Sequence, residues 1–283
     1  MKERIIGIQA TGGTGISTLE MLPLLKKNGL SGTFTMLGSK EELHLWAEKI
    51  AEYSLAYTSI HAPFKKAADI WVDGLAGEDA EKELSDAIDA CHEIEVPIVV
   101  VHPYIGFIDP YIPTKIGLKR FLRLAEQAER QNVCIALENV EGEEFLAYLM
   151  QGLRDFDSVG FCLDTGHELC YNRGKDMLEP YGDRLCYLHI NSNMGVTDPD
   201  GKIYWHDDSH MLPFDGKVDM THLATRLKKH NYQGSLIMEL VRKNKADRHT
   251  NDAYLAMTDE EYIAEAAKRI KRLRDMIEGD YNR

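Results

Sequence analysis

The strongest constraint on the fold is a regular alternation of strand-like and helix-like segments along the whole chain. The strand-like segments are short apolar runs near residues 4–9, 33–37, 56–60, 97–101, 134–138, 159–163, 185–190 and 235–239. Apolar residues recur at the helical period of 3.6 near residues 19–25, 43–50, 78–94, 118–128, 144–153, 220–229 and 259–277, and a short helix is expected after Asp164. Eight such units predict a parallel sheet with right-handed crossovers, and they favour a closed (β/α)8 barrel over an open doubly wound sheet.

The length and the glycine pattern agree with this fold. A (β/α)8 barrel typically takes about 250 residues, and the chain has 283. We therefore predict one α/β domain, a single (β/α)8 TIM barrel over residues 1–283. The run Gly12-Gly13-Thr14-Gly15 follows the first strand but lacks the Lys-Ser/Thr of a P-loop and the spacing of a dinucleotide fingerprint. We interpret it as a βα turn, with a phosphate-binding turn as the alternative.

Charge and cysteine content narrow the class of partner. The net charge of −13 weighs against general binding to nucleic acid or to anionic membranes. No segment approaches the roughly 20 apolar residues of a membrane span, and the apolar stretch from Ile5 to Ile8 is too short for a signal peptide. The five cysteines form no CxxC pair, which favours reduced thiols and a cytoplasmic location.

Six of the apolar runs stop on a residue that can bind a metal ion. These residues are His61, His102, Glu138, Asp164, His189 and Glu239. A buried parallel strand reads as a nearly continuous apolar run, so a polar residue at its carboxyl end is out of place unless the strand opens onto a site. In a (β/α)8 barrel all carboxyl ends meet on one face, where the chemistry takes place. The pattern therefore predicts a metal site on that face.

Glu138, Asp164, His189 and Glu239 form the core of the predicted site. Three carboxylates and one imidazole suit Mn²⁺, Mg²⁺, Co²⁺ or Zn²⁺. For any one of these residues the alternative is a helix cap or a salt bridge at a strand end.

His61 and His102 share a strand-His-(x)-Pro layout with Pro63 and Pro103. Proline biases the preceding residue toward extended backbone, so the chain leaves each strand without turning at once into a helix. We interpret both histidines as additional metal ligands or as substrate-binding residues, against the alternative of ordinary hydrogen-bonded histidines.

A connection of about thirty residues follows His189, and long loops in compact domains are usually functional. It carries Asp208 and His210, which together with His167 would supply a further metal site or bind substrate oxygens. His206 and Asp207 are alternatives to these two or are solvated neighbours. Trp205, with Tyr204 and Phe107, is a candidate apolar wall for a sugar ring.

The ordered motifs resemble the xylose isomerase-like (β/α)8 superfamily, which contains sugar isomerases and epimerases and endonuclease IV. They spread over most of the chain: Ile60-His61-Ala62-Pro63, Val101-His102-Pro103, Leu137-Glu138-Asn139-Val140, Cys162-Leu163-Asp164-Thr165-Gly166-His167, Leu188-His189-Ile190-Asn191, Asp208-Ser209-His210, the run from Pro213 to Asp219, and Met238-Glu239-Leu240. As an ordered set they are specific for the superfamily, but they do not name a substrate.

The resemblance implies one of two activities. In the ketose epimerase branch one divalent metal is held by Glu138, Asp164, His189 and Glu239. Glu138 and Glu239 also exchange protons with the substrate, and His167 contacts its oxygens. Asn193, Met194 and Gly195 stand where that branch has an arginine, which counts against a standard ketohexose epimerase.

In the endonuclease IV branch nine ligands hold three zinc ions that cleave a phosphodiester. All nine types have a counterpart here: His61, His102, Glu138, Asp164, His167, His189, Asp208, His210 and Glu239. Against this branch stand the acidic chain and the scarcity of Arg and aromatic wedges in the early loops.

We therefore predict a metal-dependent isomerase or epimerase of a small sugar, sugar phosphate or related polyol, with one to three divalent ions and no organic cofactor. Glu138, Glu239 and His167 are the predicted catalytic residues, and His61, His102, His210 and Trp205 the predicted substrate-binding residues. A multi-zinc phosphodiesterase is the alternative, and a catalytically silent metal- or sugar-binding barrel is the third hypothesis. By analogy with such barrels a homo-oligomer is expected.

Overall fold

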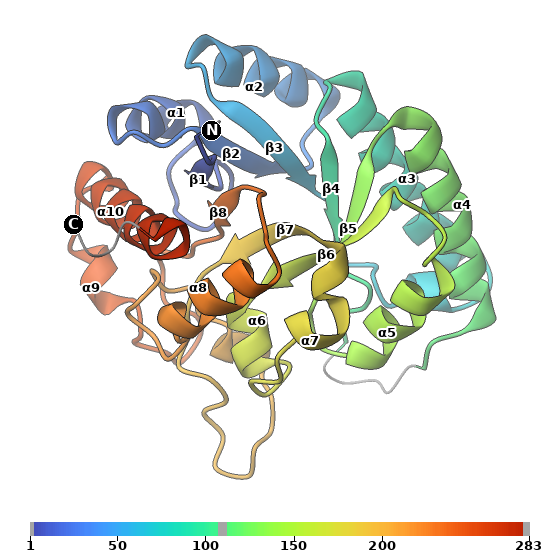
Figure 1. Cartoon of the computed structure of the whole chain (residues 1–283). Helices are drawn as coiled ribbons and strands as arrows, with labels where there is room; N and C mark the ends of the chain where they lie inside the picture. The colour runs from blue at the N-terminus through green and yellow to red at the C-terminus, as the bar shows by residue number, and fades with distance from the viewer. Residues whose placement is uncertain (1–2, 107–111, 280–283) are drawn as a thin grey trace.

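Eight parallel strands close into a barrel in sequence order, as predicted (Figure 1). The computed structural model describes residues 3–106 and 112–279. The strands are β1 (Ile6–Ile8), β2 (Gly32–Met36), β3 (Ala56–His61), β4 (Ile98–Val101), β5 (Cys134–Glu138), β6 (Val159–Asp164), β7 (Leu185–Ile190) and β8 (Leu236–Met238). Since β1 pairs with both β2 and β8, the barrel has no open sheet edge.

Helices cover the outside of the barrel (Figure 1). They are α1 (Thr18–Lys27), α2 (Lys40–Glu52), α3 (Leu75–Glu93), α4 (Lys115–Gln131), α5 (Glu143–Gly152), α6 (Thr165–Cys170), α7 (Leu178–Tyr181), α8 (Met220–Lys229), α9 (Asp252–Leu255) and α10 (Asp259–Glu278), with 3-10 turns η1 (Asp69–Trp71), η2 (Gly182–Arg184) and η3 (Trp205–Asp207). Capping boxes fix the starts of α1, α2 and α10, where Ser17, Ser39 and Thr258 accept from the backbone three residues on. No helix in the two described ranges is long and apolar enough to cross a membrane.

The barrel interior is filled by a cluster separate from the larger core between strands and helices. Its fully buried members are Phe34, Val100, Ala136, Cys162, Tyr187 and Ile237, all of them strand residues. Because side chains alternate between the two faces of a strand, these positions fix which residues farther along each strand also point inward. The interior is thus packed with side chains, and a site can form only at its ends.

The long connection after β7 projects from the body of the barrel at the foot of Figure 1, in the colour between yellow and orange. It carries η3 and returns to the barrel through a bridge between Ser192 and Met211. The glycine run after β1 is explained by packing, because a Cβ on Gly13 would lie 2.2 Å from the Leu240 carbonyl oxygen. This close approach requires glycine without any ligand, which agrees with the turn interpretation.

Candidate metal centre

The strand pattern delivers polar side chains to the carboxyl end of the barrel interior. Side chains two residues apart on a strand lie on the same face. A residue two positions after an interior apolar residue therefore also points into the barrel. The pairs are Val100 and His102, Ala136 and Glu138, Cys162 and Asp164, Tyr187 and His189, and Ile237 and Glu239. The polar partners therefore lie directly above the packed interior.

The four predicted core residues do come together. One ligand atom from each of Glu138, Asp164, His189 and Glu239 lies within 4.8 Å of the others. His189 Nδ1 is 2.9 Å from Glu138 Oε1 and 3.1 Å from Glu239 Oε2. The Glu138 side chain is fully buried, whereas that of Glu239 is 16% exposed. Glu239 is thus the member of the pair that reaches the open side of the site.

Glu138 also belongs to a second group, with His61 and His102. His61 Nε2 lies 3.3 Å and His102 Nε2 3.0 Å from Glu138 Oε2. The other oxygen, Oε1, faces His189. One carboxylate therefore connects two sets of donors, an arrangement suited to bridging two cations.

His167, Asp208 and His210 form a third group, all buried. Asp208 Oδ2 lies 3.3 Å from His167 Nε2 and 2.6 Å from His210 Nε2. Asp208 Oδ1 is buried and has no hydrogen-bond partner within the described part of the chain. An orphaned carboxylate oxygen in a dry site is costly unless a cation or water satisfies it.

Backbone carbonyls set the tautomer of three of these histidines. The Nδ1 atoms of His61, His167 and His210 lie 2.8, 2.9 and 3.1 Å from the carbonyl oxygens of Ala62, Asn139 and Glu239. A carbonyl only accepts, so each Nδ1 carries a hydrogen and each Nε2 turns its lone pair or a second proton toward the site. Each of these Nε2 atoms faces a carboxylate oxygen. A proton or a metal cation must lie between two such acceptors, and the donor set fits divalent metals.

Two asparagines hold Asp164 in place, and sequence reasoning missed both. Asn139 Oδ1 accepts from the Asp164 backbone N–H at 2.7 Å, and Asn191 Nδ2 donates to Asp164 Oδ2 at 2.7 Å. Asp164 Oδ1 also caps α6 by accepting from the His167 N–H. Asp164 therefore fills the capping role that was the alternative for it, and one of its oxygens also belongs to the four-residue group. In the sequence, the only indication was their spacing: one asparagine directly follows Glu138, and the other lies two residues after His189.

The electrostatics of the cluster follow from burial and opposite charge. Burial raises the pKa of Glu138, but His189, His102 and their hydrogen bonds outweigh it and leave the pKa well below its usual range. Burial likewise opposes the charge on His189, yet Glu138 and Glu239 raise its pKa to about 10. For Asp164 burial wins over the nearby histidines and raises the pKa to about 6. The cluster therefore holds ionised carboxylates that need positive charge.

Two neighbouring residues of the loop after β7, Asp207 and Trp205, do not join the metal donors. Asp207 accepts from Arg248 Nη2 at 2.9 Å and from Thr197 at 2.6 Å, so it is engaged away from the metal donors. Trp205 is 50% exposed, and its carbonyl accepts from Tyr171, whose ring centroid lies 4.8 Å from that of His167.

Tyr204 stacks on His206 at 5.0 Å. Phe107 lies outside the described residues. Cys162 forms the floor of the site, because its sulfur belongs to a group with Glu138 and His189.

Comparisons with known proteins agree with this fold. A family model described as a xylose isomerase-like TIM barrel matches residues 13–273. A solved D-psicose 3-epimerase from Clostridium cellulolyticum H10, crystallised with D-tagatose, superposes with a TM-score of 0.73 at 15% identity, covering 96% of this chain and 99% of that one. At this identity the likeness is one of fold.

Two curated relatives match parts of the sequence. The uncharacterized protein y4fM of Sinorhizobium fredii (strain NBRC 101917 / NGR234) is 35% identical over 115 residues, which cover 38% of this chain and 34% of that protein. A probable endonuclease 4 of Mycoplasma capricolum subsp. capricolum is 29% identical over 140 residues, covering 44% of this chain and 47% of that protein. The chain thus matches less than half the length of either relative.

Proposed function

The chain belongs to the xylose isomerase-like TIM barrel family, and we propose that it is a divalent-metal-dependent isomerase or epimerase acting on a small sugar, sugar phosphate or related polyol. The similar fold of an epimerase crystallised with D-tagatose supports a sugar as the class of ligand. Glu138, Asp164, His189 and Glu239 are the residues proposed to hold the cation, as predicted from the sequence.

The observation that carries the proposal is the convergence of two glutamates on one imidazole. Glu138 of β5 and Glu239, directly after β8, both approach His189 Nδ1, at 2.9 and 3.1 Å. A cation bound in this group would polarise a substrate carbonyl and stabilise an enediolate. A carboxylate beside that carbonyl can take the proton from the adjacent carbon and return it.

The burial of the two glutamates divides their roles. Glu138 is fully buried and has a histidine against each oxygen, so it has no free face for a substrate. Glu239 is partly exposed and contacts His189 through one oxygen, Oε2. We assign proton transfer first to Glu239 and a holding role to Glu138. We also propose that His167 of α6 contacts substrate oxygens and that Trp205 of η3 packs against a sugar ring.

Exchange of solvent deuterium into a panel of ketoses, aldoses and their phosphates tests this proposal, because enediolate chemistry exchanges a carbon-bound hydrogen. The metal-loaded protein should catalyse exchange into at least one member, and Glu239→Gln should abolish that exchange. Exchange that survives the substitution would remove Glu239 from its proposed role.

A second function, metal-dependent hydrolysis of a phosphodiester, is favoured by one specific observation. The nine donors form four groups, two of which share Glu138. Such neighbouring sites suit multi-metal clamping of the attacking and leaving oxygens in phosphodiester cleavage. The partial match to a probable endonuclease 4 points to the same chemistry. The net charge of −13 counts against a tight grip on duplex DNA.

Metal counting separates the two functions. About three zinc ions per chain, together with nicking of an abasic-site duplex at low salt, would establish the hydrolase. One manganese or cobalt ion with sugar-dependent hydrogen exchange would establish the isomerase. Bound metal with neither activity would support a barrel that only binds metal or sugar.

A further inference from the structure

Two thiols meet at the amino-terminal end of the barrel, opposite the candidate metal centre. Cys134 begins β5 and Cys186 lies near the start of β7, and their sulfurs are 3.8 Å apart. The strands that carry them are not neighbours, because β6 lies between β5 and β7. Something local must therefore bring the two side chains together across β6.

A bulge and a glycine bring them together. The pairing of β6 with β7 jumps from Phe161↔Leu185 to Cys162↔Tyr187, which leaves Cys186 as the extra residue of a bulge. A bulge re-aims a side chain, and Cys186 packs against the interior cluster along with its neighbour Tyr187. Gly160 of β6 leaves the space that Cys186 fills, since a Cβ there would lie 2.5 Å from the Cys186 sulfur.

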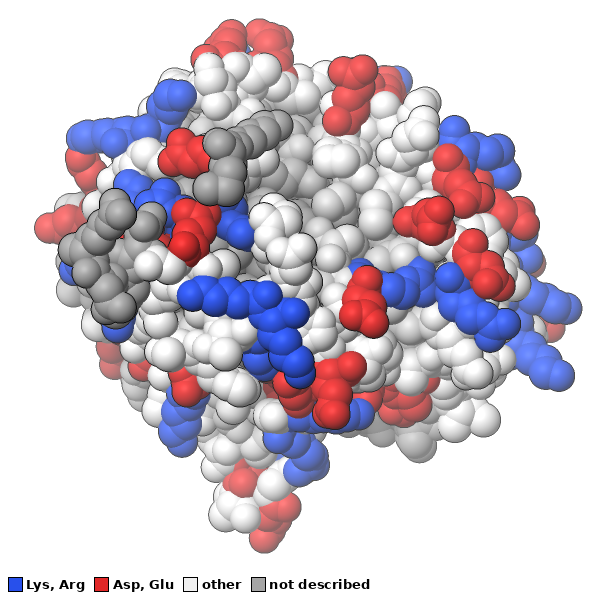
Figure 2. Space-filling model, viewed as in Figure 1, with Lys and Arg blue, Asp and Glu red and all other residues white. Residues whose placement is uncertain are grey.

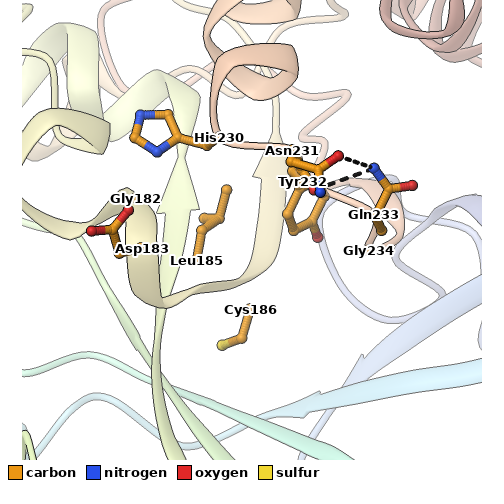
Figure 3. A pocket seen from close by; sticks show the side chains of 9 residues that line it. All are labelled: Gly182, Asp183, Leu185, Cys186, His230, Asn231, Tyr232, Gln233 and Gly234. Carbon is orange, nitrogen blue, oxygen red and sulfur yellow. Dashed lines mark hydrogen bonds between the residues drawn. The ribbon is translucent and has the colours of Figure 1, made fainter.

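A cavity reaches one member of the pair, Cys186. Cys186 lines a pocket of about 330 Å³ together with residues of η2 and of the segment before β8, among them Asp183, His230 and Tyr232 (Figure 3). Cys134 and Cys186 are free cysteines, and each residue as a whole is partly exposed. The pocket therefore brings a small polar oxidant to Cys186, whose sulfur lies 3.8 Å from that of Cys134.

The two thiols also differ in acidity. The hydrogen bond with Cys186 lowers the pKa of Cys134, aided by the Arg184 guanidinium and opposed by burial. The same hydrogen bond and burial raise the pKa of Cys186 well above its usual range. Burial raises the pKa of the other three thiols, those of Cys91, Cys162 and Cys170, so among the five cysteines, all at described positions, Cys134 is the best nucleophile.

We propose that Cys134 and Cys186 form a redox modification site, which a hydroperoxide converts to an intramolecular disulfide. The Cys134 thiolate attacks the peroxide and breaks its O–O bond, which gives a sulfenic acid and releases the other oxygen as water or alcohol after protonation. The Cys186 sulfur then displaces the sulfenic oxygen as water. The two thiols lose two electrons and two protons, and the peroxide is reduced. The sulfurs close from 3.8 Å to about 2.05 Å.

The two thiols lie on strands that also carry residues of the candidate metal centre. β5 carries Cys134 at its start and Glu138 at its end, and β7 carries Cys186 and His189. The proposal itself does not depend on the proposed function, because it concerns only the thiols.

The test is peroxide oxidation of the full chain, followed by digestion without reductant and mass spectrometry. We expect a cross-linked peptide pair joining Cys134 to Cys186, lighter than its parts by two hydrogens and separated again by dithiothreitol. In Cys186→Ser, dimedone should trap a sulfenic acid at Cys134, and in Cys134→Ser neither product should form. The proposal is overturned if Cys134 and Cys186 remain thiols, or if wild-type Cys134 stops at the sulfenic acid.

Two further variants test the geometry. Gly160→Ala places a methyl group where the Cys186 sulfur lies and should reduce the yield of disulfide several-fold, whereas the matched control Cys91→Ala should leave it unchanged. Circular dichroism checks that both variants are folded. An undiminished disulfide in folded Gly160→Ala would contradict the proposed contact, and the serine variants keep the test valid if Gly160→Ala fails to fold.

Discussion

Glu138 Oε1 and His189 Nδ1 lie 2.9 Å apart at the mouth of the barrel, although their strands, β5 and β7, are separated by β6. Two side chains on strands that are not neighbours can make contact only if both point into the barrel at the same height. Asp164, at the end of β6, lies within the same group of donors. Three consecutive strand ends thus supply ligands to one point, and Glu239 at the end of β8 completes the group.

Substitution of the two glutamates should have different effects. Glu239→Gln removes the accessible base and one of the four proposed metal donors. It should lower the rate of hydrogen exchange by about 10²–10⁴-fold, with the cation still held by the other three donors. Glu138→Gln removes a donor shared by two groups and should lower metal content as well. Elemental analysis beside the exchange assay checks this, and equal metal content in both variants would contradict the division of roles.

Asn191→Ala should weaken the metal site without removing a ligand. The variant loses the 2.7 Å hydrogen bond that orients Asp164 Oδ2. Loss of a group that hydrogen-bonds to a metal ligand typically lowers metal affinity about 10–100-fold. Titration of the metal-free protein with Mn²⁺ or Zn²⁺ measures the change. The exposed Asn231 near the start of β8 supplies a control, because Asn231→Ala should bind metal as the wild type does.

Arg226→Gln should destabilise the fold. Arg226 on α8 makes a two-pronged ion pair with Glu168 on α6, at 2.6 and 2.9 Å, and both side chains are mostly buried. Removing one partner of a buried ion pair lowers the free energy of unfolding by about 3–5 kcal/mol, because the other charge stays buried without a partner. Urea unfolding at pH 7 measures this cost, and the double variant with Glu168→Gln should recover part of it. A single variant as stable as the wild type would show that the pair contributes little.

The acid limb of stability should depend on Asp176, which also pairs with Arg226 at 2.6 Å. Burial raises the pKa of Asp176, but Arg226 outweighs burial and lowers it below the value of about 3.9 expected in the unfolded chain. A carboxyl with a lowered pKa stabilises the fold above pH about 3.9, and this contribution is lost as the pH falls through the folded value. Asp176→Asn should therefore be less stable than wild type at pH 7 and similar at pH 2.

Unfolding curves at the two pH values provide the measurement. Asp155→Asn is the control, since Asp155 is highly exposed and pairs with its neighbour Arg154 at 3.7 Å. A constant stability difference for Asp176→Asn at both pH values would contradict the assignment.

Removal of metal by a chelator should lower the unfolding temperature. The metal-free protein keeps Glu138, Asp164 and Asp208 buried with only histidines to compensate their charges. Added cation at 100 times its dissociation constant should restore about 2.7 kcal/mol per independent site. Differential scanning calorimetry with and without Mn²⁺ or Zn²⁺ checks this, and no response to any divalent cation would argue that the donors form ion pairs among themselves.

The sequence was most informative where a local pattern decides the structure. Strand periodicity placed Glu138, Asp164 and His189 at strand ends, and the closed barrel then brought these ends together without further information. Strand β8 ends at Met238, one residue earlier than expected, yet Glu239 still points into the mouth because it follows interior residue Ile237 by two positions.

Features that depend on contacts between distant segments were not accessible in this way. Nothing local distinguishes Asp207 from Asp208, and only the approach of Arg248 from the loop after β8 engages the first and leaves the second for the histidines. The Cys134 and Cys186 contact likewise depends on a bulge in the pairing of β6 with β7. Both charge signs are scattered over the face shown in Figure 2, so charge alone does not mark a site on that face.

Anomalous X-ray diffraction from crystals grown with Mn²⁺ or Zn²⁺ tests the central claim most directly. The account predicts a metal peak within about 2.0–2.3 Å of donor atoms from Glu138, Asp164, His189 and Glu239. Further peaks beside His61 and His102 or beside Asp208 and His210 would select the multi-metal function. A site without any anomalous peak, with His189 held between Glu138 and Glu239 as a plain ion pair, would contradict the account.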